Sequence, residues 1–442
     1  MNSKLLLGIL AVVVLIIIAA ALLATQQQPQ QTPAPQPPTQ SSTSPTATPP
    51  QTATPTPSPS PTAAKVKIRI WGPWSGDEYQ YFKAVLDEYQ KTHPNVEFEY
   101  VTRRAEEISQ ILPTQLEAHV APADVIFTSF GWFVTEMAKR GHLVDLTSVI
   151  NEKDYVPGIL DSVKYDGKIW AAPFTIWLKP GFWYRKSFFK SHGLSEPKTW
   201  DEFVALLSKM KEIKGLKAPI ASGDSVGWPL SDVTEAFIIA YAGPDVFKGI
   251  INRSVKFNDS RVVAVFRDRI YPLLEKGYFG PPTEWTAAVQ QWWKGEYGIY
   301  FMGTWILGMV ENVSDVGFFP MPETRGVTGG TDYIIIPKYS PNVDAAVEFV
   351  KWLATKGQEV HSSTKAGKLP SWLKADPNMI WAPLRDVYSK TVGAGMQLLP
   401  DLDDTIGGDW QKLFWDQLKL LWVQPDKWRE VVNTLAANFP SK

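Results

Sequence analysis

The chain contains no cysteine and only five histidines, and its charges nearly cancel. Without cysteine it can form no disulfide, no thiolate metal site and no lipid-modified N-terminal cysteine. The histidines show no metal-binding spacing such as His-Glu-x-x-His, so metal catalysis is not expected. With 44 basic and 45 acidic residues, no global field points to nucleic acid or another polyanion. We therefore expect no metal, no cofactor and no nucleic-acid partner.

Tryptophan, in contrast, is abundant. All 19 tryptophans lie after residue 70, and several stand beside Gly or Pro outside apolar runs. An indole is usually core or interface material, so packing is the first explanation for any one of them. Packing does not comfortably explain all 19. We expect some to line a surface for flat, amphipathic ligands.

The N-terminus carries one long apolar run. Leu5 to Ala24 is twenty residues without a charge, about 30 Å as a helix and enough to cross a bilayer core. Lys4 precedes the run and no charge follows until Lys65, which places the N-terminus in the cytoplasm and the rest outside. Residues 1–24 are therefore predicted to be an uncleaved transmembrane anchor, with a cleavable signal segment as the alternative.

Residues 25–64 consist almost entirely of Pro, Thr, Ser, Gln and Ala. Such a composition buries no core and stays extended, so it predicts a stalk that holds the following residues away from the membrane. Asn252, Asn258 and Asn312 each begin an Asn-x-Ser pattern, which is consistent with N-glycosylation of an extracellular glycoprotein. We expect a protein anchored in the cell membrane whose binding domain lies on the extracellular face.

After the stalk, strand-like and helix-like patterns alternate. Val66, Ile68 and Ile70 alternate with charged residues, which predicts a strand. The same criteria predict strands at 96–101, 124–128, 168–174, 297–302 and 333–337, and helices at 77–91, 105–119, 132–140, 343–355 and 410–422. This alternation indicates an α/β fold with a largely parallel sheet. In such sheets ligands gather at the carboxyl ends of the strands.

The stretch "GDSVGW" fits the Gly-x-Ser-x-Gly nucleophile elbow of a serine hydrolase around Ser225. The context argues against this function. Pro219 interrupts the strand that should precede the elbow, and the next helix is expected to begin only at about Ser231. His361 is the only histidine downstream, and it is predicted to end an exposed helix. Ser225 is therefore interpreted as a loop residue, and Trp228 as the functional side chain of this stretch.

A second stretch, "DLDDTIGGD" at residues 401–409, is rich in aspartate. A calcium loop would need a ligand and a glycine where Thr405 and Ile406 stand. The stretch is therefore predicted to be a helix-capping turn.

Aromatic and acidic residues recur next to the predicted strands. Sugars have apolar C–H faces and a rim of hydroxyls, which indole rings and carboxylates match respectively. The side chains at these strand ends are Trp74, Asp77, Glu78, Ser129, Trp132, Trp177, Trp228, Trp305 and Asp332. Their repetition at one edge of a sheet predicts a sugar-binding site.

Five stretches in a fixed order carry a family resemblance. They are "IRIWGPWSGDEYQYFKAVLDEYQKTHPNVEFEYV", "PADVIFTSFGWFVTEMAKRGHLVDLT", "YDGKIWAAPFTIWLKPGFWYRKSFFKSHGLSEPKTWDEF", "WWKGEYGIYFMGTW" and "GGTDYIIIPKYSPNVDAAVEFVKWLATKGQEVHSSTKAGKLPSW". Over residues 66–442 the chain resembles the extracellular solute-binding proteins of ABC importers, in the maltose-binding-protein-like family. The anchor and stalk, in place of a lipidated cysteine, resemble those of archaeal surface proteins.

The resemblance implies a two-lobed, type II periplasmic-binding-protein-like fold, with a ligand cleft between lobes that each hold a mostly parallel sheet flanked by helices. It implies lobe 1 at residues 65–173 and 322–372, and lobe 2 at residues 174–321 and 373–442. Trp305 matches the family's stacking tryptophan, and Trp177 matches a further ligand contact. The other residues at family contact positions are Asp77, Glu78, Thr128, Ser129, Trp132, Trp228 and Trp410.

The function implied by the resemblance is capture of a mono- or oligosaccharide by hinge closure, followed by delivery to a membrane permease. The protein is expected to act as a monomer and not to be an enzyme. One alternative is a membrane-anchored glycoside hydrolase that uses acids such as Asp77 and Asp332. A second alternative is an adhesion domain with a flat aromatic surface.

Overall fold

The computed structural model describes residues 65–224 and 226–441. The predicted anchor, the predicted stalk and Ser225 lie outside the described residues. Within these ranges, none of the helices combines the length and the apolar character that crossing a membrane requires.

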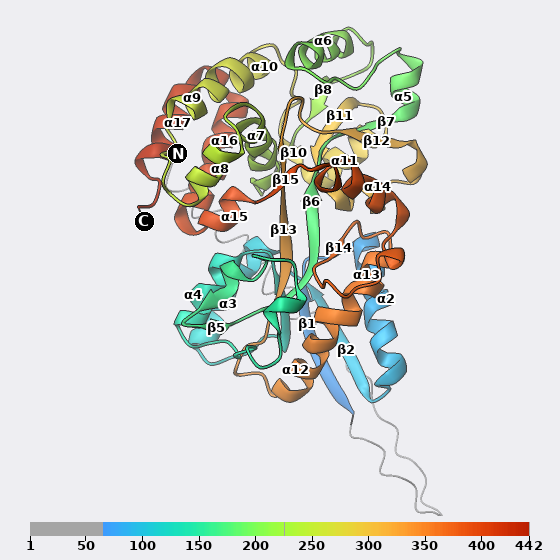
Figure 1. Ribbon diagram of the computed structural model, residues 1–442, viewed down its shortest axis with the longest axis vertical. Coiled ribbons are helices and arrows are strands. Elements are labelled where there is room, and N and C mark those ends of the chain that lie inside the picture. Colours follow the sequence, from blue (N-terminus) through green and yellow to red (C-terminus); the bar gives the residue numbers. More distant parts are fainter. Residues whose placement is uncertain (1–64, 225, 442) are drawn as a thin grey trace, which may run out of the picture. The chain divides into compact units, whose positions relative to one another are not determined.

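The first of two main sheets has the strand order β14-β6-β13-β3-β1-β2, and β15 pairs with β13 as a seventh strand. Its strands are β1 (Val66–Gly72), β2 (Val96–Thr102), β3 (Val125–Thr128), β6 (Ala172–Lys179), β13 (Gly326–Ile335), β14 (Leu369–Pro370) and β15 (Gln397–Pro400). Strands β6 and β13 are long and lie side by side along the centre of the fold (Figure 1).

The second sheet has the order β12-β7-β11-β8, and two further pairs, β4-β5 and β9-β10, stand apart from both main sheets. The bounds are β4 (Lys164–Tyr165), β5 (Lys168–Ile169), β7 (Gly181–Arg185), β8 (Ala218–Ala221), β9 (Gly223–Asp224), β10 (Thr283–Glu284), β11 (Tyr297–Met302) and β12 (Val316–Phe319). The predicted strand at 297–302 is confirmed in full.

Both sheets are mixed, although the sequence predicted mostly parallel ones. Strand β1 runs parallel to β2 and β3, but β13 runs antiparallel to β3 and β6. In the second sheet β7 runs antiparallel to β11 and β12. The reason is that β6 and β13 carry the chain in opposite directions along the centre of the fold. Alternation along the sequence does not reveal this reversal.

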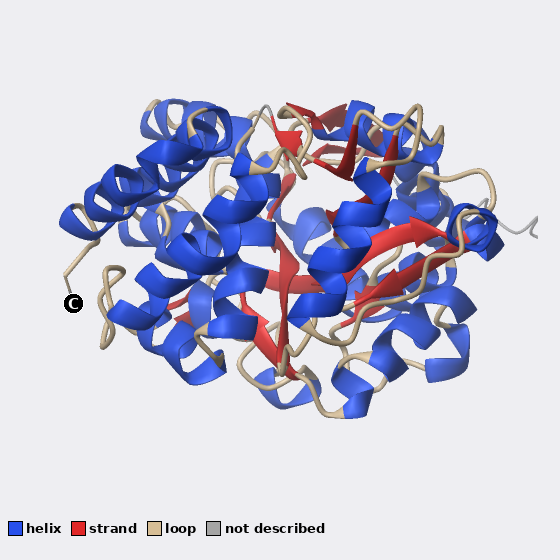
Figure 2. Ribbon diagram, turned by 90° about the horizontal axis from the view of Figure 1, so that it is seen from above, coloured by secondary structure: helices blue, strands red, loops and turns tan. Residues whose placement is uncertain are grey.

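Helices lie on both sides of the strands (Figure 2). Their bounds are α2 (Gly76–Thr92), α3 (Ala105–Glu117), α4 (Gly131–Lys139), α5 (Lys186–Ser191), α6 (Trp200–Lys211), α7 (Trp228–Tyr241), α8 (Pro244–Ile251), α9 (Ser260–Val265), α10 (Tyr271–Glu275), α11 (Trp285–Trp293), α12 (Val343–Trp352), α13 (Gln358–Ser363), α14 (Ala382–Lys390), α15 (Leu402–Ile406), α16 (Gly408–Val423) and α17 (Trp428–Ala437).

Each main sheet has its own hydrophobic core. The alternating Ile68 and Ile70 of β1 pack with Phe82 of α2 in the first core. The second core gathers Phe182 of β7 and Phe237 of α7. Apolar side chains that repeat every two residues in strands and every 3.6 residues in helices thus face the cores, as their spacing in the sequence predicts.

Two local expectations were wrong: where the helix after "GDSVGW" begins, and that His361 is exposed. Helix α7 begins at Trp228 rather than at Ser231. Pro229 stands in the first turn, where a missing N–H leaves no helical hydrogen bond unmade and the proline φ already suits a helix. His361 is fully buried and its ring stacks on Phe174 at 5.1 Å. The helical run continues past residue 355 to Ser363, which turns His361 inward.

Candidate ligand cleft

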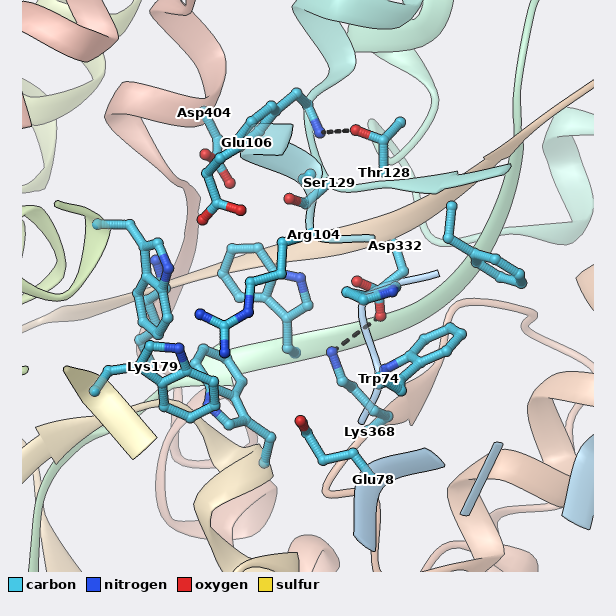
Figure 3. Close-up of a pocket in the computed structure, with 18 residues that line it drawn as sticks. Trp74, Glu78, Arg104, Glu106, Thr128, Ser129, Lys179, Asp332, Lys368 and Asp404 are labelled. Carbon is cyan, nitrogen blue, oxygen red and sulfur yellow. Dashed lines mark hydrogen bonds and ion pairs between the residues drawn. The ribbon is translucent and has the colours of Figure 1, made fainter. Parts of the chain in front are cut away.

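One pocket collects aromatic and charged side chains from the first sheet and from segments next to the second (Figure 3). Its cavity volume is about 150 Å³, and it opens to solvent on one side. Its walls are formed by Pro73, Trp74, Glu78, Arg104, Ala105, Glu106, Phe127, Thr128, Ser129, Phe130, Trp177, Lys179, Trp228, Trp285, Trp305, Asp332, Lys368 and Asp404.

Strand ends place most of these residues. Trp74 follows β1 directly, Arg104 follows β2, and Thr128 ends β3. These three strands are parallel neighbours, so their carboxyl ends meet at one edge. Trp177 and Asp332 lie on the long strands β6 and β13. The chain therefore delivers side chains to one pocket from segments more than 200 residues apart.

Four tryptophans form one wall of the pocket, which we call the indole wall. The ring of Trp305 lies 6.0 Å from that of Trp177 and 5.7 Å from that of Trp228. Trp285 lies 5.4 Å from Trp228. Trp177 and Trp285 are buried, whereas Trp228 and Trp305 are partly exposed. This arrangement leaves indole surface open to the pocket, as a flat apolar ligand face requires.

An ion pair closes the pocket on another side. The Lys368 ammonium donates to Asp332 Oδ2 at 2.9 Å, and both side chains are buried. Lys368 Nζ also lies 5.6 Å from the centre of the Trp305 ring. Thr175 donates to the same carboxylate oxygen at 3.5 Å. These contacts fix the Asp332 carboxylate at the pocket wall.

Lys179 is buried beside the indole wall and also lines the pocket. Its ammonium pairs with Asp232 and Asp401 and lies 4.7 Å from the Trp177 ring centre. Burial by itself lowers a lysine pKa, but the two carboxylates outweigh it and hold the pKa of Lys179 well above its usual value. Lys179 is therefore a permanent cation at this wall.

Two glutamates with raised pKa values line the pocket. Burial raises the pKa of Glu78 to about 7, although the nearby Lys368 and Arg104 act in the opposite direction. Burial also raises the pKa of Glu106. Arg104 points into the pocket between these acids (Figure 3), and its guanidinium lies 5.6 Å from the Trp285 ring. A neutral Glu78 can both donate and accept hydrogen bonds.

The structure brings most of the sequence-predicted site residues together. Those that line the pocket are Trp74, Glu78, Thr128, Ser129, Trp177, Trp228, Trp305 and Asp332. Asp77 is exposed in the first turn of α2 and does not line the pocket. Trp132 lines a neighbouring hollow with Trp415.

Trp410 lies in the second core instead of the pocket. It is 4% exposed, its indole N–H donates to the Leu435 carbonyl at 3.1 Å, and its ring stacks on Phe414. The amphipathic face of α16 turns Trp410 inward, so this tryptophan has a structural role.

Asn252, Asn258 and Asn312 are all exposed, which leaves the predicted glycosylation sterically open.

Several pocket residues were absent from the sequence prediction. Arg104 and Glu106 follow the predicted second strand, so the rule that selected Trp74 would have found them too. Lys179 stands two residues after Trp177, which places it on the same face of β6. Trp285, Lys368 and Asp404 carry no local signal of this kind. Only the folding of distant segments brings these three to the pocket.

The pattern of bacterial extracellular solute-binding proteins matches residues 72–360. The chain belongs to this family. An uncharacterised ABC transporter extracellular-binding protein of Pyrococcus horikoshii is 55% identical over 85% of this chain and 89% of that protein. The family predicted from the five sequence stretches is therefore confirmed.

Solved structures share the fold of this solute-binding protein at low sequence identity. A structure described for xylan utilization by Caldanaerobius polysaccharolyticus has a TM-score of 0.76 at 19% identity, covering 85% of this chain and 100% of that one. A maltose-bound T. maritima protein has a TM-score of 0.70 at 20% identity, covering 84% of this chain and 98% of that one. The predicted α/β, periplasmic-binding-protein-like fold is confirmed.

Proposed function

We propose that this solute-binding protein captures a mono- or oligosaccharide in the pocket and delivers it to the permease of an ABC importer. The observation that carries the proposal is the indole wall of Trp177, Trp228, Trp285 and Trp305, which faces a pocket that also holds carboxylates. Indole faces suit the C–H faces of a sugar ring, and carboxylates suit its hydroxyls. The T. maritima relative by fold was solved with maltose bound.

We propose that binding closes two lobes over the sugar. The proposed lobes are residues 65–173 with 322–372, and residues 174–321 with 373–442. Thr128 comes from the first of these, whereas Trp228 and Trp305 come from the second. A ligand that contacts both lobes stabilises the closed arrangement, while a ligand held by one lobe shifts nothing.

We propose that residues 1–24 anchor the protein in the membrane as a monomer, with residues 25–64 as the stalk. The long uncharged run supports the anchor. A tethered receptor remains close to its permease, which raises the effective concentration of the pair.

Titration of the full-length chain with a panel of sugars tests the proposal. Calorimetry and intrinsic tryptophan fluorescence should detect one class of sugar saturably, and Trp305→Ala should weaken its binding by at least tenfold. Trp170→Ala is the matched control, because Trp170 lies outside the pocket and bonds the Tyr165 carbonyl. If the wild-type chain gave no calorimetric or fluorescence signal with any sugar, the proposal would be overturned.

A catalytic alternative has little support in the geometry. Asp77 lies outside the pocket, and Asp332 is held by Lys368. We propose that the protein is not an enzyme. The bound sugar should therefore be recovered intact after prolonged incubation, and recovery of cleaved sugar would instead establish a hydrolase.

A further inference from the structure

Next to Lys179 lies a group of four buried carboxylates, which we call the acidic cluster: Asp232, Glu235, Asp401 and Asp403. Each is at most 3% exposed. The first two lie on α7, and the others lie at the start of α15, so the cluster joins segments about 170 residues apart. Among the described residues, only Lys179 forms an ion pair with the cluster, through Asp232 and Asp401. One cation does not balance four carboxylates.

Three of these carboxylates lie close to one another. Glu235, Asp401 and Asp403 each offer an oxygen, and the three oxygens lie within 4.8 Å of one another. Oxygens within this distance of one another can contact a single hard divalent cation, either Ca²⁺ or Mg²⁺.

Hydrogen bonds satisfy part of the cluster only. Ser231 donates to Asp403 Oδ1 at 2.9 Å, and the Trp415 indole N–H donates to Asp403 Oδ2 at 2.5 Å. The Leu402 N–H donates to Glu235 Oε2 at 3.1 Å. The other oxygen of Glu235 and one oxygen of Asp232 are buried without any hydrogen-bond partner. A buried carboxylate oxygen left alone is costly, and a bound cation or a proton removes that cost.

We propose that Glu235, Asp401 and Asp403 bind a hard divalent cation, of the class of Ca²⁺ and Mg²⁺. All three ligands are oxygen donors, as these ions prefer. Asp404 follows Asp403 of the cluster in the sequence, and Lys179 pairs with Asp401 of the cluster. Both residues line the sugar pocket (Figure 3). The cation site thus adjoins the wall of the pocket. The ion ties α7 to α15 and stabilises the folded protein by mass action.

Terbium luminescence tests this site, because Tb³⁺ replaces Ca²⁺ at oxygen ligands and emits when a nearby indole is excited. The Trp415 indole touches Asp403 directly. The full-length chain, freed of metals by chelation, should give saturable Tb³⁺ emission that excess Ca²⁺ abolishes. Ca²⁺ should also raise the melting temperature, and chelator should lower it again.

Glu235→Gln keeps the side-chain shape and removes one charge, so it should weaken Tb³⁺ binding at least tenfold. Asp386→Asn is the matched control, since Asp386 is an exposed carboxylate on α14, and it should change nothing. If Glu235→Gln does not fold, the wild-type chain alone decides. Absence of sensitised emission together with a melting temperature indifferent to Ca²⁺ would overturn the site, and would mean that protons hold the carboxylates together.

Discussion

The ammonium of Lys368 and the carboxylate of Asp332 meet at 2.9 Å in the wall of the pocket, where both side chains are less than 10% exposed. Asp332 lies on β13 and Lys368 lies directly before β14, 36 residues apart in the sequence. Burying two charges is costly unless they remain paired. The pocket is therefore built on a contact that the fold must keep intact.

Removing one partner of this pair should destabilise the protein. Lys368→Met leaves the Asp332 carboxylate buried and unpaired, which should lower the free energy of unfolding by about 3–5 kcal/mol. The double variant Lys368→Met/Asp332→Asn should recover part of the loss. Urea denaturation measures both. Lys390→Met removes an exposed ion pair with Asp386 and should cost less than about 1 kcal/mol; an equal loss in both single variants would contradict the prediction.

Trp285, which the sequence analysis did not select, should contribute to ligand binding. Trp285→Ala opens the end of the indole wall beside Trp228, so affinity for the sugar should fall about tenfold. Calorimetric titration measures the change. Trp293→Ala, on the same helix but outside the pocket, should leave the affinity unaltered. Equal effects of the two substitutions would show that the loss reflects the stability of α11.

Gly330 lets Trp177 lie flat against β13. A Cβ at this position would stand 2.3 Å from the Trp177 ring, closer than any real contact. Gly330→Ala should therefore displace the indole and reduce sugar affinity by at least tenfold, although residue 330 itself does not line the pocket. Near-ultraviolet circular dichroism should report the altered indole environment. Unchanged affinity with a changed spectrum would remove Trp177 from the binding site.

His361 should make the protein sensitive to acid. Burial and the nearby Lys368 lower its pKa from 6.5 to about 3, so the unfolded chain takes up a proton that the folded protein refuses. The stability that the neutral His361 contributes is fully present above pH 6.5 and is lost as the pH drops toward 3. Over this range the unfolding equilibrium constant rises by up to roughly tenfold per pH unit. Urea denaturation at several pH values measures the slope. His361→Gln should flatten it, and an identical slope would contradict the assignment.

Glu78 should act in the opposite direction on the alkaline side. Its pKa rises from 4.5 to about 7 on folding, so the fold favours the protonated acid. Stability is therefore lost as the pH rises from about 4.5 through 7. Glu78→Gln should therefore raise the melting temperature above that of the wild type by more at pH 8 than at pH 5, and thermal melting at the two pH values measures this. Asp77→Asn, at the exposed neighbouring position, serves as the control and should show no such difference.

Local patterns predicted much of the fold. The strand at 297–302 and the start of the helix at Ala105 are as expected, because burial periodicity is a property of the segment itself. Trp410 shows the limit. A tryptophan on an amphipathic helix can face a core or a ligand, and only the packing of α16 against α17 decides for the core.

The sequence by itself determined the family, the alternation of strands and helices, and eight of the pocket residues. Each depends on neighbours along the chain or on a recognisable stretch. The tertiary structure alone decided the antiparallel course of β6 and β13, the burial of His361, and the arrival of Trp285, Lys368 and Asp404 at the pocket. These features depend on contacts between segments far apart in the chain, where the free energy of burial and charge pairing, and not local periodicity, selects the neighbours.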